Sequence, residues 1–475
     1  MLLKNRTAGG GGCYYTGLRN KLKRCVLLQS DQPDTGSAKP VVIPRPEHNI
    51  SRAGISRQAL KVLYRLKEAG FQAFMVGGGV RDLLLGREPK DIDVVTDALP
   101  EQVRQLFRNS RLIGRRFRLV HVHFGRDYVE VATFRANTDE VDEDDADHER
   151  DHGGRILRDN VYGSIEDDVW RRDFTANALY YNIADFSIWD YCGGAGDVRD
   201  GVLRLIGDPE TRYREDPVRM LRAARFAAKL GFRLEPASEA PMHELASLVS
   251  QVPAARLFEE VLKLFLSGHA AASFDLLQHY GLFLHLFPAS DRVLSEEQAG
   301  DFRILIQQAL NNTDKRIADG LPVTPAFLFA VLLWGPIREL AAAKVDGGLS
   351  EFASLGEAAD EVIAAQQISV SIPRRFFMPM REMLAMQPRF KNTQGKRALR
   401  LLNHPRFRAA YDFLLLRTQA GEVDPELAQW WTEIQTRSPE QQGPDASVPV
   451  ERPAGAPRKR RRRRPRKAKA PDVNG

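Results

Sequence analysis

The chain has 475 residues, of which 43% are hydrophobic and 28% are charged, and its formal net charge is +7 at pH 7. This length and apolar fraction suffice for a sizeable core and predict two or three domains. No apolar run approaches the roughly eighteen residues of a membrane-spanning helix, and the N-terminus lacks the apolar core of a secretory signal, so we expect a cytoplasmic protein without a transmembrane segment. Three scattered cysteines without a CxxC pair argue against a zinc site or a disulfide framework.

Ordered structure is expected to begin near residue 50. Residues 1–50 are rich in Gly, Ser, Pro and Lys and show no sustained period, which predicts a largely disordered segment. In the following stretch, ISRQALKVLYRLKEAG, Ser56 suits the N-cap position, apolar residues recur close to helical spacing, and Gly70 suits a helix stop. A first helix is therefore expected between these two residues.

The rest of the chain changes its periodicity near residue 200. From about 71 to 200 the short β-type runs FMVGG, IDVVT, VHVHF and YVEVATF alternate with helical segments, which predicts an α/β domain with a small sheet. From about 201 to 420 the apolar spacing is helical almost throughout, which predicts an all-α region. The last 35 or so residues, dense in Pro, Gln, Gly and Arg, are expected to be disordered.

Charge is concentrated in three segments. Of the twelve residues 458–469, ten are Lys or Arg, which is typical of a tail that holds nucleic acid by charge. Residues 139–151 contain nine acids and one arginine, and we expect a disordered acidic loop there. Residues 374–400 mix Arg and Lys with Phe, a pattern that fits contacts to single-stranded RNA and equally fits charged helix faces with buried Phe.

The pattern DID, Asp91 to Asp93, places two carboxylates side by side. In a strand alternate side chains share a face, so the two aspartates project together while Ile92 packs on the other side. Two such carboxylates repel each other unless a cation lies between them, and Mg²⁺ commonly binds through one or two carboxylates plus substrate phosphates. A solvated strand end is the alternative for a lone pattern of this kind.

Three consecutive glycines, Gly77, Gly78 and Gly79, precede this pair. They follow an apolar run and lead into VRDLLLG, so a bare backbone and a helix N-terminus can approach an anion. The spacing is neither a GxGxxG fingerprint nor a Walker A loop. We therefore expect a substrate phosphate and a metal ion to bind next to each other, at the glycine turn and the two aspartates.

These features resemble a known superfamily. GGGVRDLLLGREPKDID is similar to the signature of the nucleotidyltransferases that include tRNA CCA-adding enzymes and bacterial poly(A) polymerases. Further motifs of the family follow in its order: VEVATFR (129–135), RRDFTANAL (171–179), DYCGGAGDVRDGVLRLIGDP (190–209) and REDPVRMLRAARFAAKLG (214–231). The resemblance implies a nucleotidyltransferase head domain at 51–200, a nucleotide- and RNA-binding helical neck at 201–270, a helical body and RNA-binding region at 271–425, and a disordered basic tail at 426–475.

The resemblance also implies a reaction and its residues. An RNA 3′-hydroxyl attacks the α-phosphate of a nucleotide and expels pyrophosphate, with two Mg²⁺ ions. Asp91 and Asp93 match the metal-binding pair, and Asp173 is implied as a further catalytic residue. Glu130 fits either a third carboxylate or a solvated strand face. The implied nucleotide-binding residues are Gly77, Gly78, Gly79, Arg81, Arg171, Arg172, Asp216, Arg219 and Arg222.

The motif EDPVRMLRAARF has two interpretations. From the residues alone, Asp216 is expected at the N-cap of a helix that starts with Pro217, and Arg219 and Arg222 lie three apart on one face. The resemblance adds recognition of the base edge by an aspartate and an arginine. Adenine and cytosine both present a donor beside an acceptor, so this pair does not separate an A-adding from a CCA-adding enzyme.

The segment LIGRRFRLVHVHFG, residues 112–125, separates the two branches. Its arginines alone fit a basic surface or phosphate contacts, but it resembles a segment characteristic of bacterial poly(A) polymerases. That resemblance implies template-independent polyadenylation of RNA 3′ ends from ATP, which promotes RNA turnover, with RNA ends, ATP and the RNA-degradation machinery as partners. A tRNA CCA-adding nucleotidyltransferase is the alternative.

Two other classes fit less well. A non-catalytic RNA-binding protein with a degenerate transferase domain is expected to lack one of Asp91, Asp93 and Asp173, and all three are present. A metal-dependent phosphohydrolase is expected to carry an HD motif in the helical half, and the sequence has no HD dipeptide there.

Overall fold

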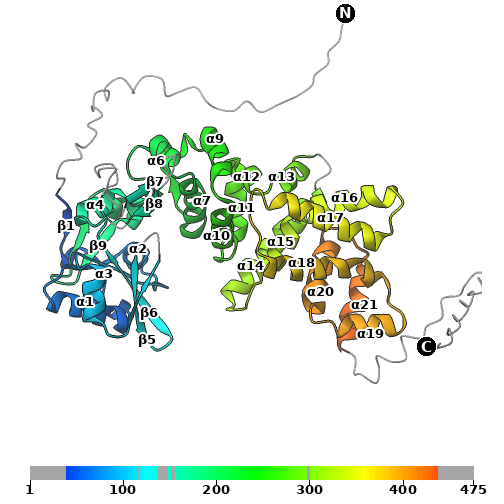
Figure 1. The fold of residues 1–475 in the computed structure, drawn as a ribbon, viewed down its shortest axis with the longest axis horizontal. Helices are drawn as coiled ribbons and strands as arrows, with labels where there is room; N and C mark the ends of the chain where they lie inside the picture. The colour runs from blue at the N-terminus through cyan, green and yellow to red at the C-terminus, as the bar shows by residue number, and fades with distance from the viewer. Residues whose placement is uncertain are drawn as a thin grey trace, which may run out of the picture. The chain divides into compact units, whose positions relative to one another are not determined.

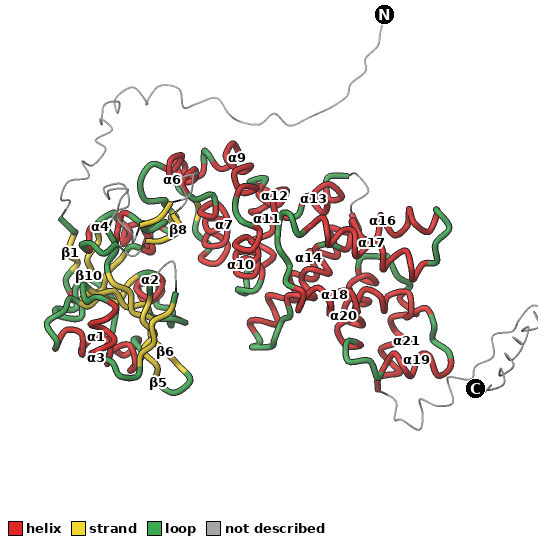
Figure 2. The backbone as a smooth tube through the Cα atoms, viewed as in Figure 1, coloured by secondary structure: helices red, strands yellow, loops and turns green. Residues whose placement is uncertain are grey.

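The computed structural model describes residues 39–114, 118–136, 148–150, 156–159, 161–296 and 300–436. The chain divides into two compact units, Met1–Gly207 and Asp208–Gly475 (Figure 1). The first holds the large sheet, and the second is built mainly from helices (Figure 2). The predicted fold class, an α/β domain followed by a helical region, is confirmed. The expected disorder of the basic tail and of the first 38 residues lies outside the described residues.

An eight-stranded sheet forms the centre of the first unit, in the order β1-β10-β9-β2-β3-β6-β5-β4. Neighbouring strands are antiparallel except β3 and β6, which are parallel. The strands are β1 (Val41–Ile43), β2 (Ala73–Val76), β3 (Asp93–Thr96), β4 (Ser110–Ile113), β5 (Leu119–Phe124), β6 (Asp127–Thr133), β9 (Leu179–Asn182) and β10 (Ile188–Asp190).

Two strands occupy segments that were expected to be disordered. Strand β1 pairs with β10 at one edge of the sheet, so residues 41–43 are ordered within the N-terminal segment 1–50. Strand β7 (His148–Arg150) lies at the end of the acidic segment and pairs with β8 (Ile156–Asp159). Backbone pairing supplies the order that local composition does not predict, with a distant strand for β1 and with a neighbouring strand for β7. Residues 139–147 of the acidic segment lie outside the described residues.

Helices pack against both faces of the sheet: the helix Ile165–Trp170 (α4) contributes Ile165 and Val169 to a buried cluster with Phe74 and Val95, and other helices lie against the opposite side. The first helix is confirmed as α1 (Arg57–Glu68), and its N-cap Ser56 accepts a hydrogen bond at Oγ from the Ala59 N–H at 3.2 Å. Helices α1 and α3 (Pro100–Leu106) pack against β6. The inward side chains of β5 and β6 are at most 4% exposed: Val120, Val122, Val129 and Val131. Clean alternation of this kind shows that one face of these strands is packed and the other is open.

The remaining helices of the first unit are short. They are α2 (Gly78–Leu84), α4 (Ile165–Trp170) and α5 (Gly194–Asp200), with the two-residue strand β11 (Val202–Leu203) after them. An aromatic cluster packs beneath the sheet, where the Phe74 ring contacts Phe134, Tyr180 and Trp189 at centroid distances of 6.1, 6.1 and 5.1 Å. Buried aromatic residues of this size contribute most to the core of the unit.

The second unit begins with shorter helices and continues with longer ones. Its elements are α6 (Pro209–Glu215), α7 (Val218–Leu230), β12 (Arg233–Leu234), α8 (Pro236–Glu239), α9 (Met242–Leu245), α10 (Ala254–Phe265), α11 (Ala270–His279), α12 (Leu282–Leu286), α13 (Pro288–Leu294), α14 (Gly300–Ala318), α15 (Pro325–Leu332), α16 (Trp334–Asp346), α17 (Glu351–Gln366), α18 (Arg374–Met386), α19 (Gly395–Leu402), α20 (Phe407–Gln419) and α21 (Pro425–Thr436). Within the described part of the chain no single helix is long and apolar enough to cross a membrane, and α15 and α16 reach that length only as a pair bent by 57°.

Candidate active site

The glycine turn brings two charged groups to one spot. Gly77 follows β2 with φ of 75°, a left-handed conformation that favours glycine. A Cβ built at this position would lie 3.8 Å from Arg172 Nη1 and 4.0 Å from Asp93 Oδ2. At Gly79 a Cβ would lie 3.5 Å from the carbonyl oxygen of Asp91. The turn therefore lies beside both the guanidinium and the segment that carries the two aspartates, and the positive φ at Gly77 is what requires glycine.

Three carboxylates lie beside this turn. Asp93 begins β3 and is in register with Glu130 on the parallel strand β6. Asp91 precedes the strand, so the expected alternation of two aspartates along one strand is wrong for Asp91. Asp93 keeps solvent-exposed surface. Its pKa is nevertheless raised to about 6, mainly by partial burial and then by the charge of Glu130, with a weaker contribution from Asp91. The charge of Arg172 opposes this rise.

This donor set fits a divalent cation that is shared with a substrate. Carboxylates that raise one another's pKa are stabilised in their charged form by a nearby cation. Among the described residues no three His, Cys, Asp or Glu side chains are placed to hold a metal by themselves. Mg²⁺ usually keeps waters and binds through one or two carboxylates and substrate phosphates. Asp91 and Asp93 therefore fit an ion whose coordination is completed by a nucleotide.

A buried network fixes Arg172. Its Nη2 and Nε donate to Asp168 Oδ2 at 2.8 and 3.2 Å, and Nε also donates to the Tyr180 hydroxyl at 2.7 Å. That hydroxyl donates to the same Asp168 oxygen at 2.7 Å. Burial alone would lower the pKa of Arg172, but Tyr180 and Asp168 raise it overall, so the guanidinium stays charged. The network holds a permanent positive charge beside the glycine turn.

Arg81 lies behind the turn. It is 2% exposed, and its Nε and Nη2 donate to Asp82 Oδ1 at 2.9 and 2.6 Å while Nη1 donates to Asn177 Oδ1. A Cβ at Gly78 would lie 3.3 Å from Arg81 Nη2. The guanidinium therefore supports the backbone of the turn from the protein interior, and its predicted direct contact with a nucleotide stays a prediction.

The other two residues of the RRD motif lie at the end of α4. Arg171 donates from Nη1 to the carbonyl oxygen of Ala136 at 2.7 Å. Asp173 is half-buried, and its backbone carbonyl accepts from the Ile206 N–H at 2.9 Å. These contacts fix the backbone that leads into the site. The nucleotide-binding role of Arg171 and the catalytic role of Asp173 stay predictions.

The motif DYCGGAGD supports this backbone. The Asp190 carboxylate accepts hydrogen bonds from the N–H groups of Cys192, Gly194 and Ala195 at 3.2, 3.0 and 2.9 Å. A Cβ at Gly194 would lie 2.1 Å from the carbonyl oxygen of Thr175, which only glycine avoids. The motif thus packs directly against the segment that follows Asp173.

In the second unit Asp216 lies between α6 and α7. Its Oδ1 accepts from the Val218 N–H at 3.3 Å. Helix α7 begins at Val218 with Pro217 at its N-cap, so the prediction of Asp216 as N-cap and Pro217 as first helical residue is wrong by one position. Its Oδ2 accepts from Arg256 Nη2 of α10 at 2.6 Å. The carboxylate is therefore held in one orientation from both sides.

The two arginines of α7 differ in their surroundings. Arg219 is 9% exposed, and its Nη1 donates to Glu215 Oε2 at 2.8 Å and to the carbonyl oxygen of Arg212 at 2.6 Å. Arg222 is half-buried, one turn further along the helix. Recognition of a base by these residues stays a prediction.

Three residues that hold predicted site residues escaped the sequence interpretation: Asp168 and Tyr180, which hold Arg172 in the first unit, and Arg256, which holds Asp216 in the second. The four-residue spacing between Asp168 and Arg172 could have indicated the first, since such pairs meet on a helix. Tyr180 and Arg256 become neighbours of the site only through tertiary packing.

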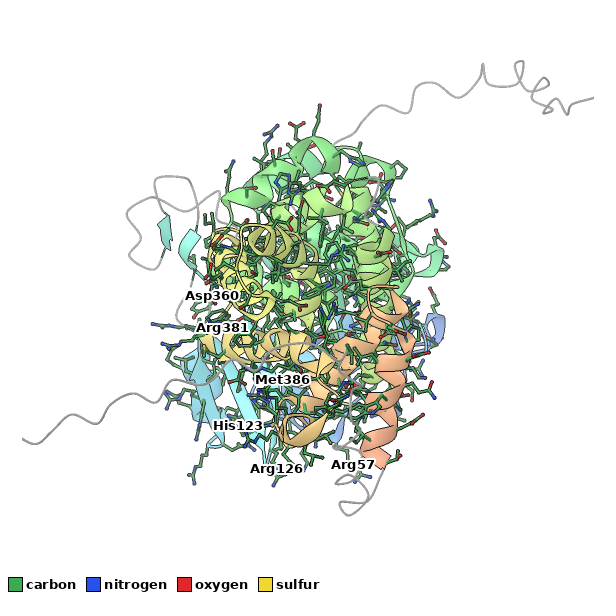
Figure 3. The ribbon with its side chains drawn as sticks, turned by 90° about the vertical axis from the view of Figure 1, so that its right-hand side faces the viewer. Arg57, His123, Arg126, Asp360, Arg381 and Met386 are labelled. Carbon is green, nitrogen blue, oxygen red and sulfur yellow. The ribbon has the colours of Figure 1, made fainter. Side chains whose placement is uncertain are left out.

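The basic segment 374–400 is largely engaged within the helical unit. Arg381 pairs with Asp360 at 2.7 Å, and Figure 3 labels both residues on neighbouring helices. Lys391 pairs with Glu351 at 2.6 Å, and Phe390 is fully buried. These residues support the interpretation as charged helix faces with buried Phe. RNA contact by the other basic residues of the segment stays a prediction.

Solved structures with this fold are tRNA-processing enzymes. The Thermotoga maritima CCA-adding enzyme complexed with tRNA aligns with 81% of this chain and 84% of its own, with a TM-score of 0.53 and 19% identity. A tRNA-processing enzyme (apo form 2) aligns with 80% and 97%, with a TM-score of 0.54 and 21% identity. At this identity the likeness shows the fold alone, which is that of a nucleotidyltransferase head joined to helical domains.

Sequence comparison defines the family. Family models match residues 73–204 (Poly A polymerase head domain), 231–294 (probable RNA and SrmB-binding site of polymerase A) and 347–468 (polymerase A arginine-rich C-terminus). Poly(A) polymerase I of Salmonella typhi is 48% identical over 467 residues, 97% of this chain and 99% of its own. The CCA-adding enzyme of Geobacillus stearothermophilus is 38% identical over 231 residues, 48% of this chain and 54% of its own. The chain therefore belongs to the bacterial poly(A) polymerase family, as the motifs predicted.

Proposed function

We propose that this enzyme is a polynucleotide adenylyltransferase that extends RNA 3′ ends with AMP from ATP, without a template. The observation that carries the proposal is identity of 47–48% to poly(A) polymerase I relatives over most or nearly all of the chain, whereas the CCA-adding relatives match about half of it. The site geometry agrees, because carboxylates, a fixed guanidinium and a glycine turn converge where a triphosphate can bind.

Charge and positioning account for the chemistry. The 3′-hydroxyl oxygen of the RNA forms a bond to the α-phosphorus of ATP, the bond from that phosphorus to pyrophosphate breaks, and the hydroxyl proton is released. No covalent nucleophile is required, because such transfers depend on alignment and on neutralising phosphate charge. Asp91 and Asp93 would hold Mg²⁺, and the family resemblance implies two ions. Bound Mg²⁺ would neutralise phosphate charge and lower the pKa of the attacking hydroxyl.

The protein supplies the rest in fixed positions. The charged Arg172 and the amides of the glycine turn bind the triphosphate, and their geometry is set before substrate arrives, which avoids reorganisation during the reaction. In the second unit Asp216, held by Arg256, recognises the base together with Arg219 or Arg222. The RNAs that are extended, a link to RNA degradation and a cytoplasmic location remain predictions.

The test uses purified protein with Mg²⁺, an unstructured RNA unrelated to tRNA and each nucleoside triphosphate separately. We expect long homopolymeric extension with ATP and little with the other three. The Asp91→Asn/Asp93→Asn double variant, purified in parallel, controls for a contaminating polymerase. Addition that stops after three nucleotides and requires CTP would assign the chain to the CCA-adding class.

A further inference from the structure

The open face of β5 and β6 continues from the carboxylates of the site. Asp93 is in register with Glu130, Glu130 with His121, and His121 with Arg111, so one row of side chains crosses β3, β6, β5 and β4. The row changes from acidic at the catalytic end to basic at the sheet edge. The opposite side chains of β5 and β6 are buried valines, so this row lies on the unpacked face.

Three ring-bearing side chains gather on this face. His121 stacks on Tyr128 with ring centroids 4.3 Å apart and planes 10° from parallel, and His123 lies beside Tyr128 at 6.0 Å. Tyr128 is nevertheless 51% exposed, so part of its ring is free to contact a ligand. We call His121, His123 and Tyr128 the His-Tyr platform.

Polar groups of the platform connect it to the site and to a ligand. His121 Nε2 lies 3.3 Å from Glu130 Oε1, which fixes the histidine against the carboxylate row. His123 Nε2 is buried without a hydrogen-bond partner among the described residues. A buried polar atom of this kind is costly to leave without a partner. Arg111 and Arg126, the latter labelled with His123 in Figure 3, are exposed near the same strands.

The distance from the catalytic carboxylate suits a nucleic acid strand. Tyr128 is two residues along β6 from the register partner of Asp93, so strand geometry places the two Cα atoms about 8 Å apart. A stacked strand advances about 3.4 Å per nucleotide, so the platform lies two or three nucleotides from the reacting end. Aromatic rings that stack on bases bind any sequence, because every base has a π-face.

We propose that the His-Tyr platform stacks the bases next to the 3′ end of the RNA and so positions its terminal hydroxyl for attack. The proposal rests on the proposed function and adds the residues that hold the primer. Exposed Arg111 and Arg126 supply charge for its phosphates. A base stack contributes about 1–3 kcal/mol, so its loss is expected to weaken RNA binding about 5- to 150-fold.

The test compares Tyr128→Leu, which keeps apolar bulk but no ring, with Tyr128→Phe, which keeps the ring. Tyr128→Leu is expected to raise KM for RNA about tenfold with little change in KM for ATP, whereas Tyr128→Phe stays near wild type. Val42→Ala, at an exposed position on the far edge of the sheet, is the control and should change neither constant. A rise confined to KM for ATP would mean that the platform holds the incoming nucleotide, and unchanged constants would also overturn the proposal.

A binding measurement separates this proposal from the proposed function. RNA carrying 2-aminopurine at the third nucleotide from its 3′ end is titrated with protein without ATP or Mg²⁺, so no chemistry is needed. Stacking on the platform should quench its fluorescence in wild type and Tyr128→Phe but not in Tyr128→Leu, and a probe near the 5′ end should respond equally in all three. Equal quenching in all variants at both positions would exclude the platform, whereas failure of wild type to extend RNA with ATP would contradict only the assigned reaction.

Discussion

Each unit of the molecule contains a buried arginine–carboxylate network, and the two networks have different roles. In the head domain Asp168 and Tyr180 engage Nε and Nη2 of Arg172, while Nη1 is the guanidinium nitrogen nearest Gly77. The network therefore presents its cation to the glycine turn. Fixed charge directed at a substrate contributes to catalysis because it needs no rearrangement in the transition state.

In the helical unit the cations are directed inward. Glu422 accepts hydrogen bonds from Trp334 Nε1 at 2.9 and 3.0 Å, from Arg338 Nη1 at 2.6 Å and from Arg417 Nε at 2.9 Å. Its side chain is 4% exposed. These bonds connect the start of α16 with the end of α20. The same chemistry thus connects helices in one unit and orients a group that is predicted to bind substrate in the other. Mutations should separate the two roles.

The largest effect is expected at the carboxylates that Arg172 faces. Asp91→Asn and Asp93→Asn each replace a charged metal ligand by a neutral one, so kcat for extension should fall by about 10³-fold or more. Circular dichroism should match wild type, because both side chains keep exposed surface and the fold does not depend on them. A variant that retains near-normal extension in Mg²⁺ would remove that residue from the metal site.

Mutation of the Glu422 network in the helical unit should lower stability and leave kcat nearly unchanged. Glu422→Gln leaves Arg338 and Arg417 without their buried counter-charge, which is expected to cost about 3 kcal/mol and lower the Tm by roughly 6–12 °C. The kcat at a temperature where the variant is folded should change less than twofold. Glu382→Gln, which breaks the exposed pair with Arg406, is the matched control and should lower stability by less than about 1 kcal/mol.

A smaller, kinetic effect is expected from the head network. Tyr180→Phe removes one hydrogen bond to Arg172 and one to Asp168, so kcat/KM for ATP should fall about tenfold while KM for RNA is unchanged. Tyr181→Phe is the control, because its hydroxyl is buried without a partner among the described residues. If both variants behave alike, the Tyr180 hydroxyl does not position Arg172.

The contrast also shows what sequence can predict. The strands β2, β3, β5 and β6, helix α1 and the pairing of a glycine turn with Asp93 follow from local pattern, since alternation, capping and turn chemistry are encoded within a few residues. Partners such as Tyr180 and Arg256 lie 8 and 40 residues from the groups they hold, and only the folded chain brings them together. The order of β1 was missed for the same reason, because its partner β10 lies about 150 residues further along the chain.

The smallest expected effect is the pH dependence of stability at Asp93. It distinguishes the repelling carboxylates of the head domain from the Glu422 network, whose charges are paired. Asp93 has a pKa of about 6 in the folded protein, above its ordinary value of 3.8, so folding favours its protonated form. That stabilisation is fully present below about pH 4 and is lost as pH rises through about 6. Because Asp93 is exposed, solvent screening reduces the effect to about 1 kcal/mol.

Without metal, Asp93→Asn should therefore be more stable than wild type at pH 7.5 by this amount and equal to it near pH 4. Added Mg²⁺ should close the gap at pH 7.5 by stabilising wild type alone, as thermal melts in EDTA and in Mg²⁺ would measure. A difference in Tm that does not change with pH would show that repulsion among Asp93, Glu130 and Asp91 is not its cause.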